Sequence, residues 1–342
     1  MGVNFDKPQN WKADIAQSVD MYNDWFMKFA PKAFRDTRIQ TTKDVEAALK
    51  ATGNLTNIQP SLLKRNPAIL PTLRMSTCPP LAVDRLIGLA KVSKSLVKRM
   101  EKEHKLPVRM SEPDLNAELK KIGSIVRKMA DPDIFVWLRR RAPATEAEIH
   151  RAATIVADRL CGSVANPIIR NAQEKRQLAE IKAWLAARGY TQLPAGEGTR
   201  FNAMPPGTFS FRMNVPIRLV GGEEALKVLE ESEDGKAVIE VDEKGVKVNI
   251  PIDAVIMPKK AKRGDLPIFF EAKSAGDFTN TNKRRKEEAV KMAQLRNTYG
   301  NKMSFNLFLC GYFDSGYLGY EAAEGIDWAW EHRISDLAKF GI

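Results

Sequence analysis

The first half of the chain has the apolar spacing of helices. Between about residues 10 and 165, apolar residues recur every three or four positions, in segments such as WKADIAQSVDMYNDWFMKFA, TKDVEAALKAT, LAVDRLIGLA and EAEIHRAATIVADRL. Prolines at positions 60, 67, 71, 79, 80 and 107 divide this region into short helices. Thr145-Glu-Ala-Glu148 fits a capping box and predicts a helix start. We therefore expect a helical domain over residues 1–165.

The pattern changes after a further predicted helix, from Ile169 to Arg188, which Gly189 would end. Four β-like runs follow, bounded by Gly, Pro and charged loops: FSFRMNVPIRLV, VKVNIPIDAVIM, LPIFFEAKS and MSFNLFLCGYF. Between the last two runs, KRRKEEAVKMAQLRNTYG predicts a helix that stops at Gly300. This order of elements predicts an α+β domain over residues 166–342, with helices flanking a mixed β-sheet.

Two of the predicted strands carry charges where apolar residues are expected. In PIFFEAKS, Phe269, Glu271 and Lys273 share one face of the strand, and Ala272 lies on the other. A buried strand excludes such charges unless they are paired or bind an ion. Asp253 interrupts the preceding strand, and the basic loop MPKKAKRGD lets the chain turn back between the two. We expect Asp253, Glu271 and Lys273 to lie close together.

These groups suit the hydrolysis of a phosphodiester. The carboxylates of Asp253 and Glu271, with the carbonyl of Ala272, form an all-oxygen donor set of the kind that Mg²⁺ prefers. The metal would lower the pKa of a bound water, and Lys273 could orient or help deprotonate that water. The structural alternative is that Asp253 caps a strand end while Glu271 and Lys273 form a surface salt bridge.

The pattern Pro251-Ile-Asp253 followed by Glu271-Ala-Lys273 resembles the PD-(D/E)xK nuclease superfamily. The predicted order of helices and strands is that of the superfamily core. The match departs from the motif in that Ile252 separates the proline from the aspartate. The resemblance implies a further metal-binding acid on the first helix of the core, for which Glu174 is the candidate, with Glu180 behind it.

The chain is basic, with a formal net charge of +12, which makes a polyanion such as double-stranded DNA the leading partner. After the ExK run, Asn and Arg side chains that can bind base edges gather in the segment Asn280, Thr281, Asn282, Lys283, Arg284 and Arg285. The same residues could instead bind phosphates without reading sequence.

A second basic segment, LAKVSKSLVKRMEKEHK, resembles the second half of a helix-turn-helix, with a turn near Ser93. Its candidate DNA contacts are Lys94, Lys98 and Arg99. Many amphipathic helical hairpins share this pattern, so a purely structural role is the alternative.

The stretch FFEAKSAGDFTNTNKRRKEEA, with NPIIRNAQEKRQ and the N-terminal WKADIAQSVDMYNDWFMKFAP, resembles the XamI family of type II restriction endonucleases over most of the chain. The resemblance implies Mg²⁺-dependent cleavage of both DNA strands at a short palindrome, GTCGAC. Because a palindrome has twofold symmetry, a homodimer with one active site on each strand is the expected assembly.

Other features exclude several classes of protein. No GxxxxGK[ST] loop is present, so a nucleotide cofactor is not expected. The sequence has no apolar run of membrane-spanning length and no signal peptide, and we expect a cytoplasmic protein without a membrane partner. Two alternative functions stay open, a structure-specific repair or junction-resolving nuclease with the same core, and a DNA-binding regulator whose sheet is purely structural.

Overall fold

A computed structural model describes residues 2–140, 142–194, 200–219, 238–242, 245–278 and 281–342. The chain forms two compact units. The sheet unit comprises Met1–Lys28 and Arg170–Ile342, and the helical unit comprises Phe29–Ile169. No helix in the described ranges is both long and apolar enough to cross a membrane.

Two long helices each contribute residues to both units. They are α1 (Pro8–Ala51) and α7 (Glu146–Ala186). The sequence pattern predicted separate, shorter helices in these regions, and that division was wrong, because α1 continues through Pro31 and α7 through Pro167. A proline inside a helix removes one hydrogen bond at a cost of about 3 kcal/mol, which the many intact turns on either side can offset.

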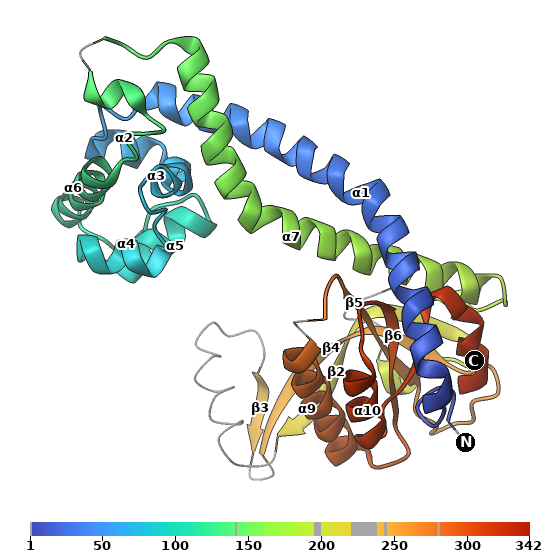
Figure 1. The fold of residues 1–342 in the computed structure, drawn as a ribbon. Coiled ribbons are helices and arrows are strands. Elements are labelled where there is room, and N and C mark those ends of the chain that lie inside the picture. The colour runs from blue at the N-terminus through green and yellow to red at the C-terminus, as the bar shows by residue number, and fades with distance from the viewer. Residues whose placement is uncertain (1, 141, 195–199, 220–237, 243–244, 279–280) are drawn as a thin grey trace. The chain divides into compact units, whose positions relative to one another are not determined.

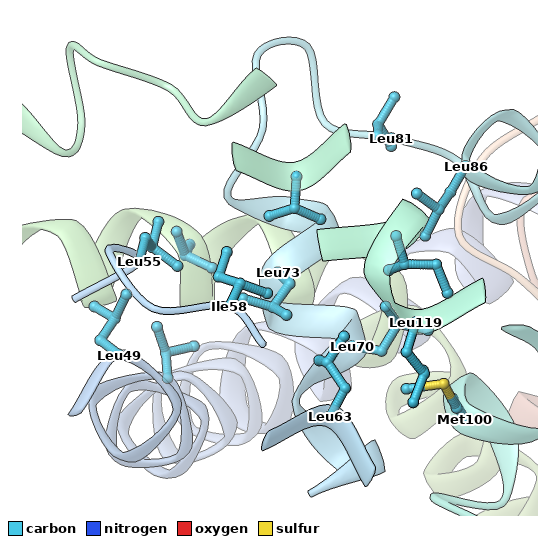
Figure 2. Packing of buried hydrophobic residues seen from close by; sticks show 14 of the residues in the cluster. Leu49, Leu55, Ile58, Leu63, Leu70, Leu73, Leu81, Leu86, Met100 and Leu119 are labelled. Carbon is cyan, nitrogen blue, oxygen red and sulfur yellow. The ribbon is translucent and has the colours of Figure 1, made fainter. Parts of the chain in front are cut away.

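The helical unit is built around a leucine-rich core. Its shorter elements are α2 (Pro60–Arg65), η1 (Pro67–Ile69), α3 (Leu70–Met75), α4 (Val83–Ala90), α5 (Lys94–Lys102), α6 (Glu112–Met129) and η2 (Val136–Arg139). Figure 2 shows side chains from several of these helices meeting in one cluster, among them the fully buried Leu63, Leu73 and Leu119. The predicted cap at Thr145 forms, because Thr145 and Glu148 exchange side-chain and backbone hydrogen bonds.

The sheet unit contains a mixed, seven-stranded sheet among the described residues, in the order β1-β2-β4-β5-β6-β7, with β3 paired to β4. β2, β4 and β5 are antiparallel, and β5, β6 and β7 are parallel. The strands are β1 (Thr191–Gln192), β2 (Thr208–Leu219), β3 (Val238–Asp242), β4 (Gly245–Met257), β5 (Ile268–Ala275), β6 (Ser304–Gly311) and β7 (Asp327–Trp330). This arrangement confirms the predicted α+β fold with a mixed sheet.

Helices cover both faces of this sheet (Figure 1). On one face, α9 (Thr281–Tyr299) and α10 (Ser315–Ala323) pack against a cluster that includes Phe269 of β5. On the other face, α7 contributes Ile181 to a cluster that includes Phe270. Neighbouring residues of β5 therefore point to opposite faces, as predicted. The described residues of this unit also form η3 (Phe201–Ala203) and η5 (Glu331–Phe340).

Candidate active site

Asp253 of β4 lies beside Glu271 of β5, and two hydrogen bonds join the strands at this point. The backbone N–H of Asp253 donates to Oε2 of Glu271 at 3.2 Å, and the backbone N–H of Ala272 donates to Oδ2 of Asp253 at 2.9 Å. β4 and β5 are antiparallel, and Ala254 is paired with Phe270. The residue before Ala254 and the residue after Phe270, which are the two acids, therefore lie next to each other. The antiparallel turn predicted from the sequence thus brings the two carboxylates together.

Asp253 projects from an irregular position in the sheet. On β4, Ile252 packs in the cluster under α9, but Ala254 packs in the cluster under α7, so strict alternation breaks at Asp253. The partner strand β2 changes in the same place, since Phe211 and Met213 pack on opposite faces although they are two residues apart.

The irregularity has a backbone cause at Arg212, which lies between the paired positions Phe211↔Ala254 and Met213↔Ile252 and therefore opposite Asp253. Arg212 has a φ of 50°, a left-handed conformation that non-glycine residues rarely adopt. One residue with this backbone conformation changes the face of the sheet to which the following side chains point, as β-bulges beside active sites do. The result is that Asp253 lies beside Glu271 while its neighbours on β4 remain paired with β2.

Helix α9 supplies a partner to each charged residue of β5. Lys291 Nζ forms an ion pair with Oε1 of Glu271 and also donates to the backbone carbonyl of Pro251 at 3.2 Å. Lys273 Nζ lies 3.7 Å from Oε1 of the buried Glu288. Each acid on one element thus pairs with a lysine on the other: Glu271 of β5 with Lys291 of α9, and Glu288 of α9 with Lys273 of β5. The alternative was a surface salt bridge between Glu271 and Lys273. In the structure Glu271 is buried, at 5% exposure, and its ion pair is with Lys291 of α9.

Burial, together with the neighbouring acids, raises the pKa of Asp253 to about 7. Burial is the largest cause, followed by the negative charge of Glu271, while Lys273 and the bond from Ala272 act in the opposite direction. Glu174 of α7 also raises this pKa, so its charge acts at the same site. Clustered acids with a raised pKa are typical of sites that bind cations or carry out proton transfer.

A second buried acid lies behind Lys273. Glu288 accepts a hydrogen bond from the hydroxyl of Tyr317 at 2.8 Å. Burial, and then the neighbouring Glu288, raise the pKa of Glu321 on α10 to about 9. At neutral pH the Glu321 carboxyl therefore stays protonated.

Asp253, Glu271, Ala272 and Lys273 thus lie in one place, with Glu174 at its edge. The Glu174 carboxylate is 2.7 Å from the guanidinium of Arg212. No group of three or more His, Cys, Asp or Glu side chains is arranged as a metal site in the part of the chain that the structure describes. Backbone carbonyls and water are ligands that Mg²⁺ commonly retains beside carboxylates, so a cation at Asp253 and Glu271 does not require a preformed cluster of three acids.

The predicted DNA-binding residues fall in two places. Asn280 lies outside the described residues, and Thr281, Asn282, Lys283, Arg284 and Arg285 form the first turns of α9, where the structure describes the backbone and not these side chains. In the helical unit, α4 ends at Ala90, and Ser93 caps α5 by accepting from the N–H of Leu96. On α5, Lys94 is exposed, whereas Lys98 and Arg99 are half-buried, and Arg99 pairs with Glu103 at 3.1 Å.

Lys291, Glu288 and Arg212 also lie at the site but were not among the residues predicted from the sequence. Glu288 could have been found, because it lies four residues before Met292 on the apolar stripe of α9, where a carboxylate needs a partner. Lys291 follows three residues later and looks like an ordinary surface lysine in the sequence. Nothing in the sequence around Arg212 indicates its left-handed backbone.

Comparisons with known proteins place the chain in a family. The family model described as XamI restriction endonuclease matches residues 53–330. The type II restriction enzyme SalI of Streptomyces albus G is 52% identical over 339 residues, which cover 99% of this chain and 99% of that enzyme. No solved structure matches the chain. At this identity and coverage, the chain belongs to the XamI family of type II restriction endonucleases.

Proposed function

We propose that this enzyme cuts both strands of double-stranded DNA at the palindrome GTCGAC, in a Mg²⁺-dependent reaction, with a PD-(D/E)xK site built from Asp253, Glu271 and Lys273. The observation that carries the proposal is the pair of carboxylates joined across β4 and β5, with a lysine two residues further along β5. Family membership favours this activity over a structure-specific repair nuclease and over a DNA-binding regulator.

The residues present fit a hard divalent cation. Asp253 and Glu271 offer carboxylate oxygens, and their mutual repulsion contributes to a pKa near 7 for Asp253 that a cation would lower. All of the donors are oxygens, which suits Mg²⁺ better than zinc or copper. Ala272 would contribute its carbonyl, and Glu174 would be the further acid, since its charge already acts on Asp253.

In the proposed mechanism, each side chain has a definite task. When bound, Mg²⁺ would supply Lewis acidity and lower the pKa of a coordinated water. Asp253 and Glu271 would hold that cation beside the scissile phosphate. Lys273 orients the attacking water and offsets the negative charge that develops on the phosphate oxygens in the transition state. Glu288 keeps the Lys273 ammonium in position through their ion pair.

Recognition is proposed to lie next to this site. The residues Asn280–Arg285 lead into and begin α9, the same helix that contributes Glu288 and Lys291. Asn and Arg side chains there would read base edges, and lysines would bind phosphates. Lys94, Lys98 and Arg99 of α5 are proposed as additional DNA contacts. A homodimer acting in the cytoplasm would place one such site on each strand of the palindrome.

The test is a digestion of two matched plasmids with the full-length protein and Mg²⁺. One plasmid carries a single GTCGAC site, and the other differs from it by one base pair in that site. We expect the first to become linear with a unique pair of ends and the second to stay intact. Discrete cleavage of both plasmids at another common sequence would overturn the proposed site, and cleavage only at branched or damaged DNA would favour a repair nuclease.

A further inference from the structure

Lys291 forms an ion pair with Glu271, the residue to which the proposed function assigns the binding of the cation. It is on α9, three positions after Glu288, so both side chains lie on the side of the helix that meets β5. Its ammonium contacts Oε1 of Glu271 and the carbonyl of Pro251, which belongs to β4. A positive charge from a third element therefore joins the two strands that carry the acids.

This contact is built into the fold. Glu271 is 5% exposed, and the Lys291 side chain is 21% exposed, so both charges have lost much of their hydration. A buried carboxylate is costly unless it is paired and hydrogen-bonded. Here, both oxygens of Glu271 are engaged, Oε1 by Lys291 and Oε2 by the N–H of Asp253. Lys291 therefore supplies the counter-charge that Glu271 needs.

A divalent cation bound by Glu271 would meet the Lys291 ammonium, because Oε1 accepts from Lys291 and Oε2 accepts from the N–H of Asp253. An ammonium group donates hydrogen bonds and has no lone pair with which to bind a metal. It also repels a second cation strongly at short range in a partly desolvated site. Lys291 and a divalent cation therefore compete for Oε1 of Glu271.

We propose that Lys291 is a positioning residue that competes with the divalent cation for Glu271, so that the ammonium is displaced from Oε1 when the cation binds. The inference rests on the proposed function, because it takes Glu271 as a ligand of the cation. Lys291 would keep the acidic site folded and charge-balanced before the cation arrives, and would weaken the affinity of the free enzyme for that cation.

A merely structural brace makes the opposite prediction. If Lys291 only held β4, β5 and α9 together, its removal would loosen the site and weaken cation binding. Competition predicts tighter cation binding after the same change. The sign of the change in affinity therefore separates the two roles, and no measurement of cleavage is needed.

The experiment titrates the full-length protein with Mn²⁺, an oxygen-seeking ion whose free electron paramagnetic resonance signal reports the unbound fraction. The variants are Lys291→Met, which removes the charge at similar length, Lys291→Arg, which retains it, and Glu271→Gln, which removes the ligand. Lys302→Met is the matched control, because Lys302 is an exposed lysine of the same unit. Thermal unfolding with and without Mn²⁺ shows whether each variant is folded.

We expect Lys291→Met to lower the dissociation constant for Mn²⁺ by about tenfold or more, while Lys291→Arg and Lys302→Met stay near the parent value. Lys291→Met should also unfold at a lower temperature than the parent without Mn²⁺ and gain more from adding it. Unchanged or weaker binding in Lys291→Met, with binding abolished in Glu271→Gln, would overturn the inference and leave the cation site intact. Parent-like binding in Glu271→Gln would overturn the cation site itself, and the inference with it.

Discussion

The backbone N–H of Asp253 donates to the carboxylate of Glu271, at 3.2 Å, so the position of one acid depends on the backbone of the other. The return bond, from the N–H of Ala272 to Asp253, closes a small ring across β4 and β5. Two carboxyls are thereby held side by side by neutral N–H donors. After burial, the negative charge of Glu271 is the next cause of the raised pKa of Asp253, and a cation would favour the ionised form of both groups, which is the physical basis of the proposed activity.

The pair of Lys273 and Glu288 predicts a catalytic effect without loss of DNA binding. Glu288→Gln keeps the shape of the side chain but removes the charge beside the Lys273 ammonium. We expect the single-turnover cleavage rate to fall by about tenfold, equivalent to roughly 1.4 kcal/mol, with the affinity for DNA unchanged. The matched control is Glu287→Gln on the same helix, where the residue is exposed. Equal rates in the parent and Glu288→Gln would show that this pair does not position the lysine.

The left-handed backbone of Arg212 predicts an unusual order of stabilities. Arg212→Gly and Arg212→Ala both remove the ion pair with Glu174, but only glycine adopts a φ of 50° without strain. We expect the glycine variant to be more stable than the alanine variant by about 1 kcal/mol, as measured by chemical denaturation. In a regular strand, glycine would be the less stable of the two, so that order would argue against the irregular geometry at this position.

Charged residues in apolar strands could be predicted from the sequence, whereas the change of face within β2 could not. Charges in apolar strands identified Asp253, Glu271 and Lys273, because desolvation makes such residues rare without a purpose. The alternation of β2 was misleading in one respect. Apolar residues occupy every second position from Phe209 to Leu219, which reads as one face, yet the structure places Phe211 and Met213 on opposite faces. Both faces of the sheet are buried, so an apolar pattern stays compatible with a reversal.

The residues that sequence analysis missed act through tertiary contacts. Lys291 meets Glu271 only because α9 packs on β5, and a lysine on an otherwise charged helix is usually a solvated residue. The strand β7 and the helix α10 were also missed. Asp327–Trp330 is only four residues long, and its pairing with β6 depends on the parallel crossover rather than on local pattern.

The pKa of Glu321 predicts how stability depends on pH. This carboxyl ionises near 4.5 in an ordinary environment and near 9 in the folded protein, because burial and Glu288 oppose its charge. Between these values the folded state holds a proton that the unfolded state has released, so the free energy of unfolding should fall as pH rises, by up to about 1.4 kcal/mol per pH unit. Glu321→Gln cannot ionise, and its denaturation midpoints between pH 5 and 9 should decline less than those of the parent. Parallel declines would contradict the raised pKa.

The most direct test of the active site measures DNA cleavage and DNA binding in the same three variants, Asp253→Asn, Glu271→Gln and Lys273→Met. Each is close in shape to the parent residue, so folding should persist, as circular dichroism would check. With Mg²⁺ and a duplex that the parent enzyme cuts, we expect single-turnover cleavage to fall by roughly a thousandfold or more in each variant, while the dissociation constant for DNA changes little. Cleavage at the parental rate in Glu271→Gln, in a folded protein that binds the same DNA, would contradict the site described here.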